Sequence, residues 1–326
     1  MFRLIYSNNI PFDMHDWEQE HLIALFGGGS CLMAMTRDGR ILRKTQTKSP
    51  FPYLDNWLQH DIFKITVGSL FSDFAIGLTR NGACIPMTEK WMAHWWKSCA
   101  SDYREYSHRY EKPTNMPDSY ENAVRKIRNL KNIRQVLISD AVFALDWFGF
   151  VHYIPFPRSS ELYHEVHNWR NVIRLIATPE ANIFGITADG RVLAAGHSTG
   201  DHGPKGNVRD KIDALTDVAG FVPEGPECTD MYYIKYDGTL HSLFPNFFWT
   251  QNLRIAQSCC SPPEFLCSFS NRVLYLKDMD GTVYRVPPIR NEATEIAQDV
   301  VSFACSNSYI DYYAALVARP PDRYRR

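Results

Sequence analysis

The sequence predicts an all-β fold, a seven-bladed β-propeller closed by strands from the N- and C-terminal ends of the chain. Three observations predict it: apolar strands paired around tight-turn sequences, a regular spacing of those turns, and an N-terminal apolar segment with no neighbour of its own. A chain of 326 residues is long enough to bury the core of such a closed architecture. We therefore treat residues 1–326 as a single propeller domain.

Six turn sequences ending in glycine lie between pairs of short apolar strands. They are Asp38-Gly39, Asn81-Gly82, Phe148-Gly149, Asp189-Gly190, Asp237-Gly238 and Asp280-Gly281. Asp-Gly and Asn-Gly favour the positive φ angles of a tight hairpin. Successive turn glycines are 43, 67, 41, 48 and 43 residues apart, a spacing that is typical of propeller blades except for one outlier.

A further apolar strand precedes each hairpin, so each unit contains at least three strands. These preceding strands read HLIALFG, IFKITVG, IRQVLIS, VIRLIAT, DVAGFVP and NLRIAQS. Trp17, Trp57 and Trp169 open three of the units, and Leu130 and Leu215 take similar places in two others. Because these residues recur at one position of the repeat, we expect them to wedge neighbouring blades together.

A seventh unit occupies residues 294–326, and the chain ends about where its hairpin should turn. Residues 1–7, MFRLIYS, form an apolar segment before the first complete repeat. We expect this segment to cross over and complete the last blade. A ring closed in this way protects both sheet edges, which otherwise promote aggregation.

The stretch NWRNVIRLIATPEANIFGITADGRVLAAGHSTGDHG at 168–203 resembles the repeat of the regulator-of-chromosome-condensation family, a set of seven-bladed propellers. The resemblance implies that His197, Asp201 and His202 lie in the inter-blade loop of the repeat, where glycines allow tight turns. A metal-binding or catalytic role for these three is the alternative. No other copy of the repeat supplies a further ligand at an equivalent position, so no metal is expected.

The outlying spacing indicates a helical insertion at residues 88–130, between blades two and three. Its first helix starts at Thr88, stops before Pro113, and carries an aromatic stripe consisting of Trp91, Trp95, Trp96, Tyr103, Tyr106 and Tyr110. A second helix, capped by Asp118, places Tyr120, Val124, Ile127 and Leu130 on one side. The stripe is too large to stay bare, so it packs on the propeller or contacts a partner protein.

Composition narrows the classes of partner and compartment. The chain has 35 basic and 36 acidic residues, without the basic excess of a nucleic-acid-binding protein. It has no apolar run long enough to span a membrane and no recognisable export signal. Eight scattered cysteines fit a reduced, cytoplasmic protein. No nucleotide-binding or hydrolase motif is present, so we expect no cofactor.

The leading functional interpretation is a non-catalytic protein–protein interaction module that presents its loops and the aromatic insertion to a partner protein, or to a second copy of the chain. One alternative is a lyase or hydrolase with its active site in the central channel, which would require convergence of groups such as His21, His60 and His152. The other is a carbohydrate- or peptide-binding propeller that uses Trp17, Trp57 and Trp169.

Overall fold

The structure is a computed structural model, and every structural statement below refers to the residues that it describes. These are 2–28, 31–45, 60–67, 75–86, 120–139, 141–155, 163–177, 182–196, 208–224, 230–237, 239–243, 253–254, 264–267, 274–277, 281–286, 294–305 and 313–318.

Seven antiparallel sheets are present among the described residues. The first contains β2 (Leu22–Gly28), β3 (Cys31–Thr36) and β4 (Ile41–Thr45), and the second contains β5 (Ile62–Val67), β6 (Ala75–Thr79) and β7 (Cys84–Pro86). The third contains β8 (Ile133–Ile138), β9 (Ala141–Asp146) and β10 (Val151–Pro155). The fourth contains β11 (Val172–Ala177), β12 (Asn182–Thr187) and β13 (Val192–Gly196).

The fifth and sixth sheets have four strands each. The fifth contains β14 (Val218–Glu224), β15 (Asp230–Lys235), β16 (Thr239–Ser242) and β17 (Leu253–Arg254). The sixth contains β18 (Glu264–Cys267), β19 (Leu274–Lys277), β20 (Val283–Val286) and β21 (Thr294–Ala297). The last sheet joins β1 (Phe2–Tyr6) to β22 (Val300–Cys305) and β23 (Tyr313–Ala318).

Two strand assignments made from the sequence are wrong. The segment NLRIAQS does not open the sixth unit, because Leu253–Arg254 forms β17 and pairs with β16 at the edge of the fifth sheet. Thr294–Ala297 does not open the seventh unit, because it forms β21 and pairs with β20 in the sixth sheet. A strand that follows a hairpin can extend the same sheet, and its apolar pattern is the same in either position.

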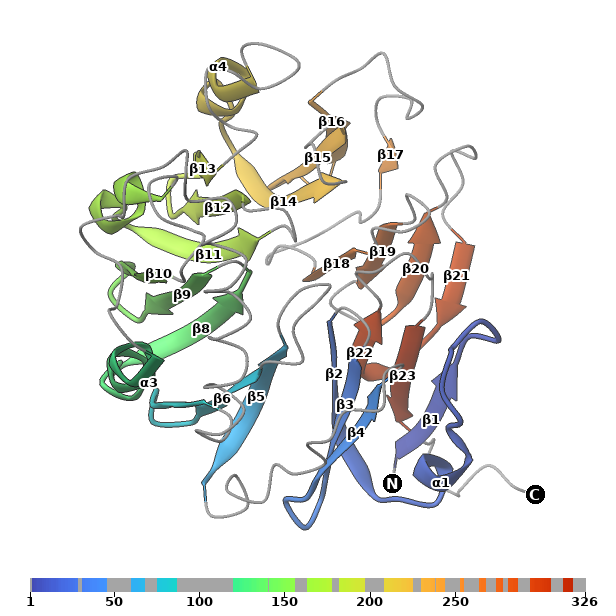
Figure 1. Ribbon diagram of the computed structural model, residues 1–326. Coiled ribbons are helices and arrows are strands. Elements are labelled where there is room, and N and C mark those ends of the chain that lie inside the picture. The colour runs from blue at the N-terminus through green and yellow to red at the C-terminus, as the bar shows by residue number, and fades with distance from the viewer. Residues whose placement is uncertain are drawn as a thin grey trace, which may run out of the picture.

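The sheets are arranged about a common centre, with successive sheets adjacent to one another (Figure 1). The first strand of each sheet contacts neighbouring sheets: β2 contacts β22 and β5, β8 contacts β5 and β11, β14 contacts β12, and β18 contacts β14 and β22. Side-chain hydrogen bonds link several of these strands: Thr66 Oγ1 to the Val136 carbonyl (2.7 Å), Gln135 Nε2 to the Leu175 carbonyl (2.8 Å), and the Leu25 N–H to Ser302 Oγ (2.8 Å).

The two ends of the chain close the arrangement, as the sequence predicts. β1 pairs antiparallel with β23, in a register that runs from Phe2 opposite Ala318 to Tyr6 opposite Ala314. The Ser7 N–H extends this ladder by donating to the Tyr313 carbonyl at 3.0 Å. The N-terminal strand therefore completes the sheet that contains the C-terminal strand.

The apolar core lies between neighbouring sheets, and two of the expected tryptophan wedges are found there. Trp17 is 3% exposed and packs among residues of the first and last sheets. Trp169 is 6% exposed and packs between the third and fourth sheets. The wedge prediction is confirmed for these two residues, while Trp57 lies outside the described residues.

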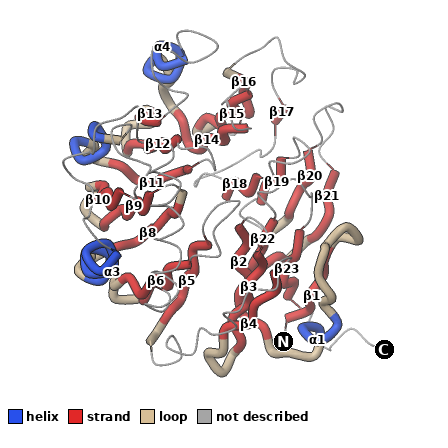
Figure 2. Tube along the Cα trace, viewed as in Figure 1, coloured by secondary structure: helices blue, strands red, loops and turns tan. Residues whose placement is uncertain are grey.

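Short helices lead into four of the first strands and lie at the periphery of the molecule (Figure 2). They are α1 (His15–Glu18), α3 (Tyr120–Arg128), the 3₁₀ helix η3 (His164–Asn168) and α4 (Val208–Asp213). In α3, Val124 and Ile127 are buried against the second and third sheets, on the apolar side that the sequence predicts. α3 precedes β8 as α4 precedes β14, and the helical insertion at residues 88–130 stays a prediction. Residues 88–119, with the expected first helix, lie outside the described residues. None of the helices in the described part is long and apolar enough to cross a membrane.

Candidate interaction face

A recurring hydrogen bond joins four of the hairpin turns to the start of the next sheet. The carbonyl of the turn glycine accepts the N–H of the first residue of the following first strand in four places: Gly82 from Ile133 (3.0 Å), Gly149 from Val172 (3.1 Å), Gly190 from Val218 (2.9 Å) and Gly281 from Val300 (2.8 Å). All four glycines have positive φ, between 77° and 84°. The turns therefore form one end of the ring together with the starts of the first strands. We call this end the turn face.

The residue before each of these strands adopts a left-handed conformation that the sequence analysis did not anticipate. Asn132, Asn171, Asp217 and Asp299 have φ between 54° and 59°. Each of their carbonyls accepts an N–H at the end of the strand that pairs with the first strand of the same sheet, for example Trp147 N–H to the Asn132 carbonyl at 3.0 Å. Asn and Asp tolerate this conformation better than other non-glycine residues. An Asn or Asp followed by Ile or Val was the signal available in the sequence.

A β-bulge lies at the second residue of the first strand in six of the described sheets. The register skips one residue near the start of β2, β5, β8, β11, β14 and β22. Bulges of this kind re-aim side chains out of a sheet. Four of the skipped residues are exposed apolar side chains, namely Ile23 (38%), Phe63 (37%), Ile173 (37%) and Val301 (45%).

The hairpin between β9 and β10 carries the largest exposed apolar side chains on this face. Trp147, Phe148 and Phe150 are 63%, 69% and 41% exposed, and we call these three residues the aromatic hairpin. Asp146, which is buried, holds the turn: its Oδ1 accepts the N–H groups of Phe148 and Phe150, both at 2.9 Å. Its Oδ2 lies 3.0 Å from His152 Nε2. The backbone of the aromatic hairpin is therefore fixed while its side chains stay in solvent.

Three arginines lie over exposed aromatic rings of the turn face. The guanidinium carbon lies 5.9 Å from the ring centre of Trp147 for Arg134, 4.7 Å from that of Phe150 for Arg170, and 6.0 Å from that of Phe63 for Arg80. Cation–π contacts of this kind hold a guanidinium in place at little cost in entropy. Burial lowers the pKa of Arg134, but a guanidinium stays protonated in proteins at neutral pH.

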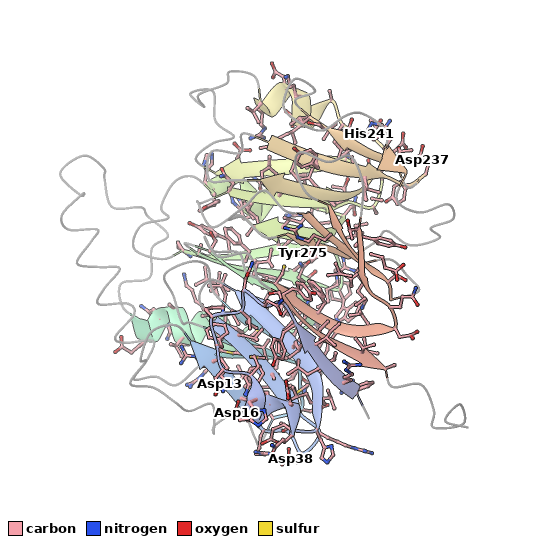
Figure 3. The ribbon with its side chains drawn as sticks, turned by 90° about the vertical axis from the view of Figure 1, so that its right-hand side faces the viewer. Asp13, Asp16, Asp38, Asp237, His241 and Tyr275 are labelled. Atoms are coloured by element: carbon pink, nitrogen blue, oxygen red, sulfur yellow. The ribbon has the colours of Figure 1, made fainter. Side chains whose placement is uncertain are left out.

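In the hairpin of the fifth sheet, Asp237, Thr239 and His241 form a chain of hydrogen bonds that resembles a catalytic triad. The hydroxyl in this chain donates to the carboxylate and not to the histidine. Thr239 Oγ1 donates to Asp237 Oδ1 at 2.6 Å and lies 2.7 Å from His241 Nε2. Because the hydroxyl proton points to the carboxylate, His241 is not placed to activate the hydroxyl as a nucleophile. Hydrogen bonding from Thr239 lowers the pKa of Asp237. Figure 3 shows Asp237 and His241 together, towards the opposite end of the view from Asp13, Asp16 and Asp38.

The histidines considered for a central active site lie in separate places. His21 and His60 are exposed and precede β2 and β5, whereas His152 lies on β10 and contacts Asp146. Among the described residues no three metal-binding side chains come together.

Most of the site residues expected from the sequence lie outside the described part of the chain. These are Trp91, Trp95, Trp96, Tyr103, Tyr106 and Tyr110 of the aromatic stripe, and His197, Asp201 and His202 of the loop. They stay predictions. The sequence analysis missed the aromatic hairpin, although a signal was present: WFGF stands where most other copies carry a polar Asp-Gly or Asn-Gly turn.

Comparison with known proteins identifies the fold as an RCC1-like β-propeller. The structure matches Prp20p from Saccharomyces cerevisiae, at a TM-score of 0.52 and 11% identity over 97% of this chain and 85% of that one. It also matches human WBSCR16, at a TM-score of 0.54 and 12% identity over 92% and 88% of the two chains. Yeast RCC1 (Prp20) bound to Kap60 matches at 0.52 and 12%, over 97% and 83%. At these identities the likeness defines the fold alone. The sequence itself matches no family model and no curated protein.

Proposed function

We propose that this chain is a seven-bladed propeller that acts as a non-catalytic protein-interaction module, with the aromatic hairpin at the centre of its docking surface. The observation that carries the proposal is the exposure of Trp147, Phe148 and Phe150 on a turn fixed by a buried carboxylate. Seven sheets in cyclic contact support the blade count. The structural neighbour Prp20p is described with binding to Gsp1p and histones, which supports a protein partner for a propeller of this type.

Energetic considerations favour this surface over other exposed parts of the propeller. Each large aromatic side chain can bury about 150–250 Å² in a contact. Tryptophan and arginine are enriched among the residues that contribute most to protein–protein affinity. Because the hairpin backbone is already ordered, a partner would not have to supply the entropy of fixing it.

The aromatic stripe and the loop residues predicted from the sequence are a second candidate surface. Residues 88–119 lead directly into α3, and α3 leads into Asn132, whose carbonyl accepts the Trp147 N–H. Trp95 and Trp96 belong to the segment that precedes α3 in the sequence, and this segment lies outside the described residues. A second copy of this chain is an alternative partner for either surface.

A comparison of surface variants tests the proposal. Trp147→Ala combined with Phe148→Ala should abolish capture of partners from native extract while leaving the melting temperature within about 2 °C, because both side chains are exposed. Tyr236→Ala is the matched control, because Tyr236 holds the equivalent position in the fifth sheet and is 44% exposed. Size-exclusion chromatography with light scattering would distinguish self-association.

Two outcomes would contradict the assignment. If all three proteins capture the same partners equally, the aromatic hairpin is not the docking surface. If only Trp95→Ala with Trp96→Ala loses the partners, the aromatic stripe of the insertion is the interaction site instead.

A further inference from the structure

The aromatic hairpin belongs to one continuous surface that spans three sheets. The Gly82 carbonyl binds the Ile133 N–H, which joins the turn of the second sheet to the third. The Gly149 carbonyl binds the Val172 N–H, which joins the third sheet to the fourth. Arg134 crosses the second of these junctions, since its Nη2 donates to the Val172 carbonyl at 2.8 Å. Phe63, the aromatic hairpin and Ile173 therefore follow one another along the turn face.

The charged groups described on this surface are mostly cationic, although the whole chain has a net charge of −1. Arg80, Lys131, Arg134, Arg170 and Arg191 are the cations described there. Of the three carboxylates, Asp61 pairs with Arg80 at 3.3 Å and Asp189 pairs with Arg191 at 2.8 Å. Asp146 is buried and occupied by the hairpin N–H groups and His152. The positive charge is therefore local and lies among exposed aromatic rings.

The arginines keep hydrogen-bonding capacity for a ligand. Arg134 donates one hydrogen bond within the described residues, from Nη2 to a backbone carbonyl. Arg170 uses its Nη1 for the carbonyls of His167 and Trp169, at 2.7 and 2.8 Å. Stacking on Trp147 and Phe150 positions both guanidinium groups beside the aromatic hairpin. A planar guanidinium held in this way is suited to bidentate binding of a carboxylate.

We infer that this surface binds an acidic, apolar peptide segment of another protein, with its carboxylates on Arg134 and Arg170 and an apolar side chain against Trp147 and Phe148. The inference rests on the proposed function and specifies the chemistry of the partner. A single-stranded nucleic acid also combines negative charge with stacking surfaces. The overall charge of −1 favours the peptide, because a polyanion gains most of its affinity from an extended basic surface.

Selection from a display library of random 12-residue peptides on the purified full-length chain tests the inference. Clones that bind the unmodified chain but not the Trp147→Ala, Phe148→Ala double variant define the ligands of this surface. We expect these clones to be enriched in Asp and Glu beside apolar residues. Replacing their Asp and Glu by Asn and Gln should weaken binding about tenfold or more, as measured by fluorescence anisotropy.

Charge variants of the protein provide the reciprocal measurement. The double variant Arg134→Gln, Arg170→Gln should bind the acidic peptides more weakly by the same factor. Its affinity for the amide versions of these peptides should change little. Arg191→Gln is the matched control, because Arg191 is an exposed hairpin arginine of the fourth sheet that pairs with Asp189. If the loss of Arg134 impairs folding, Arg170→Gln alone serves as the second variant, and its melting temperature shows whether it is folded.

The outcomes separate the two proposals. Clones that depend on the aromatic hairpin but are neutral or basic, or that bind equally after amidation, would overturn the acidic-peptide inference and leave the docking surface intact. Failure to recover any clone that depends on Trp147 and Phe148 would overturn the proposed function itself. A twelve-residue oligothymidine is the nucleic-acid probe. If the unmodified chain binds it more tightly than any peptide and the Trp147→Ala, Phe148→Ala double variant does not bind it, the surface binds nucleic acid and the inference is overturned.

Discussion

Single residues at the hairpin turns determine how tightly each turn is held. Thr36, Thr79 and Thr187 are buried, and each hydroxyl donates to the Asp or Asn two residues later, as Thr187 does to Asp189 at 2.5 Å. The Thr187 hydroxyl also accepts the N–H of Arg191, and the Thr79 hydroxyl accepts the N–H of Ala83. These hydrogen bonds lower the pKa of the Asp189 carboxyl, with Thr187 as the largest cause.

We predict that Asp189→Asn reduces the acid sensitivity of the fold. The pKa of Asp189 in the folded protein lies below its ordinary value of 3.8. The ionised carboxylate therefore stabilises the folded protein above pH 3.8, and this stabilisation is lost as the pH falls through the folded-state pKa. Asparagine keeps the acceptor oxygen, as Asn81 does for Thr79 in the second sheet, and it does not titrate. Urea midpoints measured from pH 2 to pH 6 should therefore fall less steeply for the variant.

The control for this prediction is Asp210→Asn, which removes an exposed carboxylate on α4 outside any hairpin turn. A smaller effect of that variant than of Asp189→Asn would show that the hydrogen-bonded carboxylate of the turn is responsible. An acid profile of Asp189→Asn that is identical to that of the unmodified protein would show that the Thr187 hydrogen bond does not favour the ionised carboxylate.

At the scale of elements, turn-glycine hydrogen bonds join four pairs of neighbouring sheets. Gly82 has a φ of 79°, and a Cβ atom there would lie 2.7 Å from the Ile133 nitrogen and 2.9 Å from Asn132. Gly39 has a φ of 86° but no atom within 4 Å of such a Cβ. The two turns therefore share a backbone conformation and differ in how closely the next sheet approaches.

We predict that Gly82→Ala destabilises the protein more than Gly39→Ala. Both variants incur the left-handed conformation of a non-glycine residue, which costs about 1–2 kcal/mol. Gly82→Ala also forces β8 away from the turn, which adds about 1–3 kcal/mol of overpacking. Free energies of unfolding from urea titration compare the two directly. Equal losses would mean that the contact between the second and third sheets relaxes without strain.

At the scale of the whole molecule, the pairing of β1 with β23 joins the two ends of the chain. Leu4 and Tyr6 of β1 pack with the apolar cluster that contains Trp17, between the last sheet and the first. The Ser302 hydroxyl connects β22 to β2 across the same junction. Among the described strands, the pairing of β1 with β23 has the longest sequence separation, so it forms at the highest cost in loop-closure entropy.

We predict that deletion of residues 1–6 lowers the melting temperature and promotes association, because it exposes the edge of β23. A synthetic peptide with the sequence MFRLIYS, added in trans, should restore part of the loss by refilling the ladder. The same peptide with proline in place of Ile5 is the control. Ile5 lies two residues from Ser7, so its N–H faces β23 as that of Ser7 does, and proline cannot donate to the strand pairing. Calorimetry and light scattering of the three samples test the prediction. An unchanged melting temperature after the deletion would show that the ends do not hold the ring together.

Local features were predictable because they depend on residues close together in the sequence. Five of the six turn glycines, all except Gly238, are described and have positive φ, and β2, β5, β8, β11 and β14 lie where apolar alternation places them. The burial of Trp17 and Trp169 followed from their recurrence in the repeat. The pairing of residues 253–254 and 294–297 was not predictable, because an apolar strand reads alike at the end of one sheet and at the start of the next.

By itself the sequence determined the turns, most first strands, the repeat and the pairing of the chain ends, because each is encoded in glycine positions and apolar alternation. Only the tertiary structure decided which surface presents aromatic side chains. WFGF becomes an exposed, fixed hairpin because Asp146 binds its backbone and the neighbouring sheet binds the Gly149 carbonyl. The arginines that stack on it come from other parts of the repeat. Exposure is a property of packing between sheets, and no local stretch of sequence contains that information.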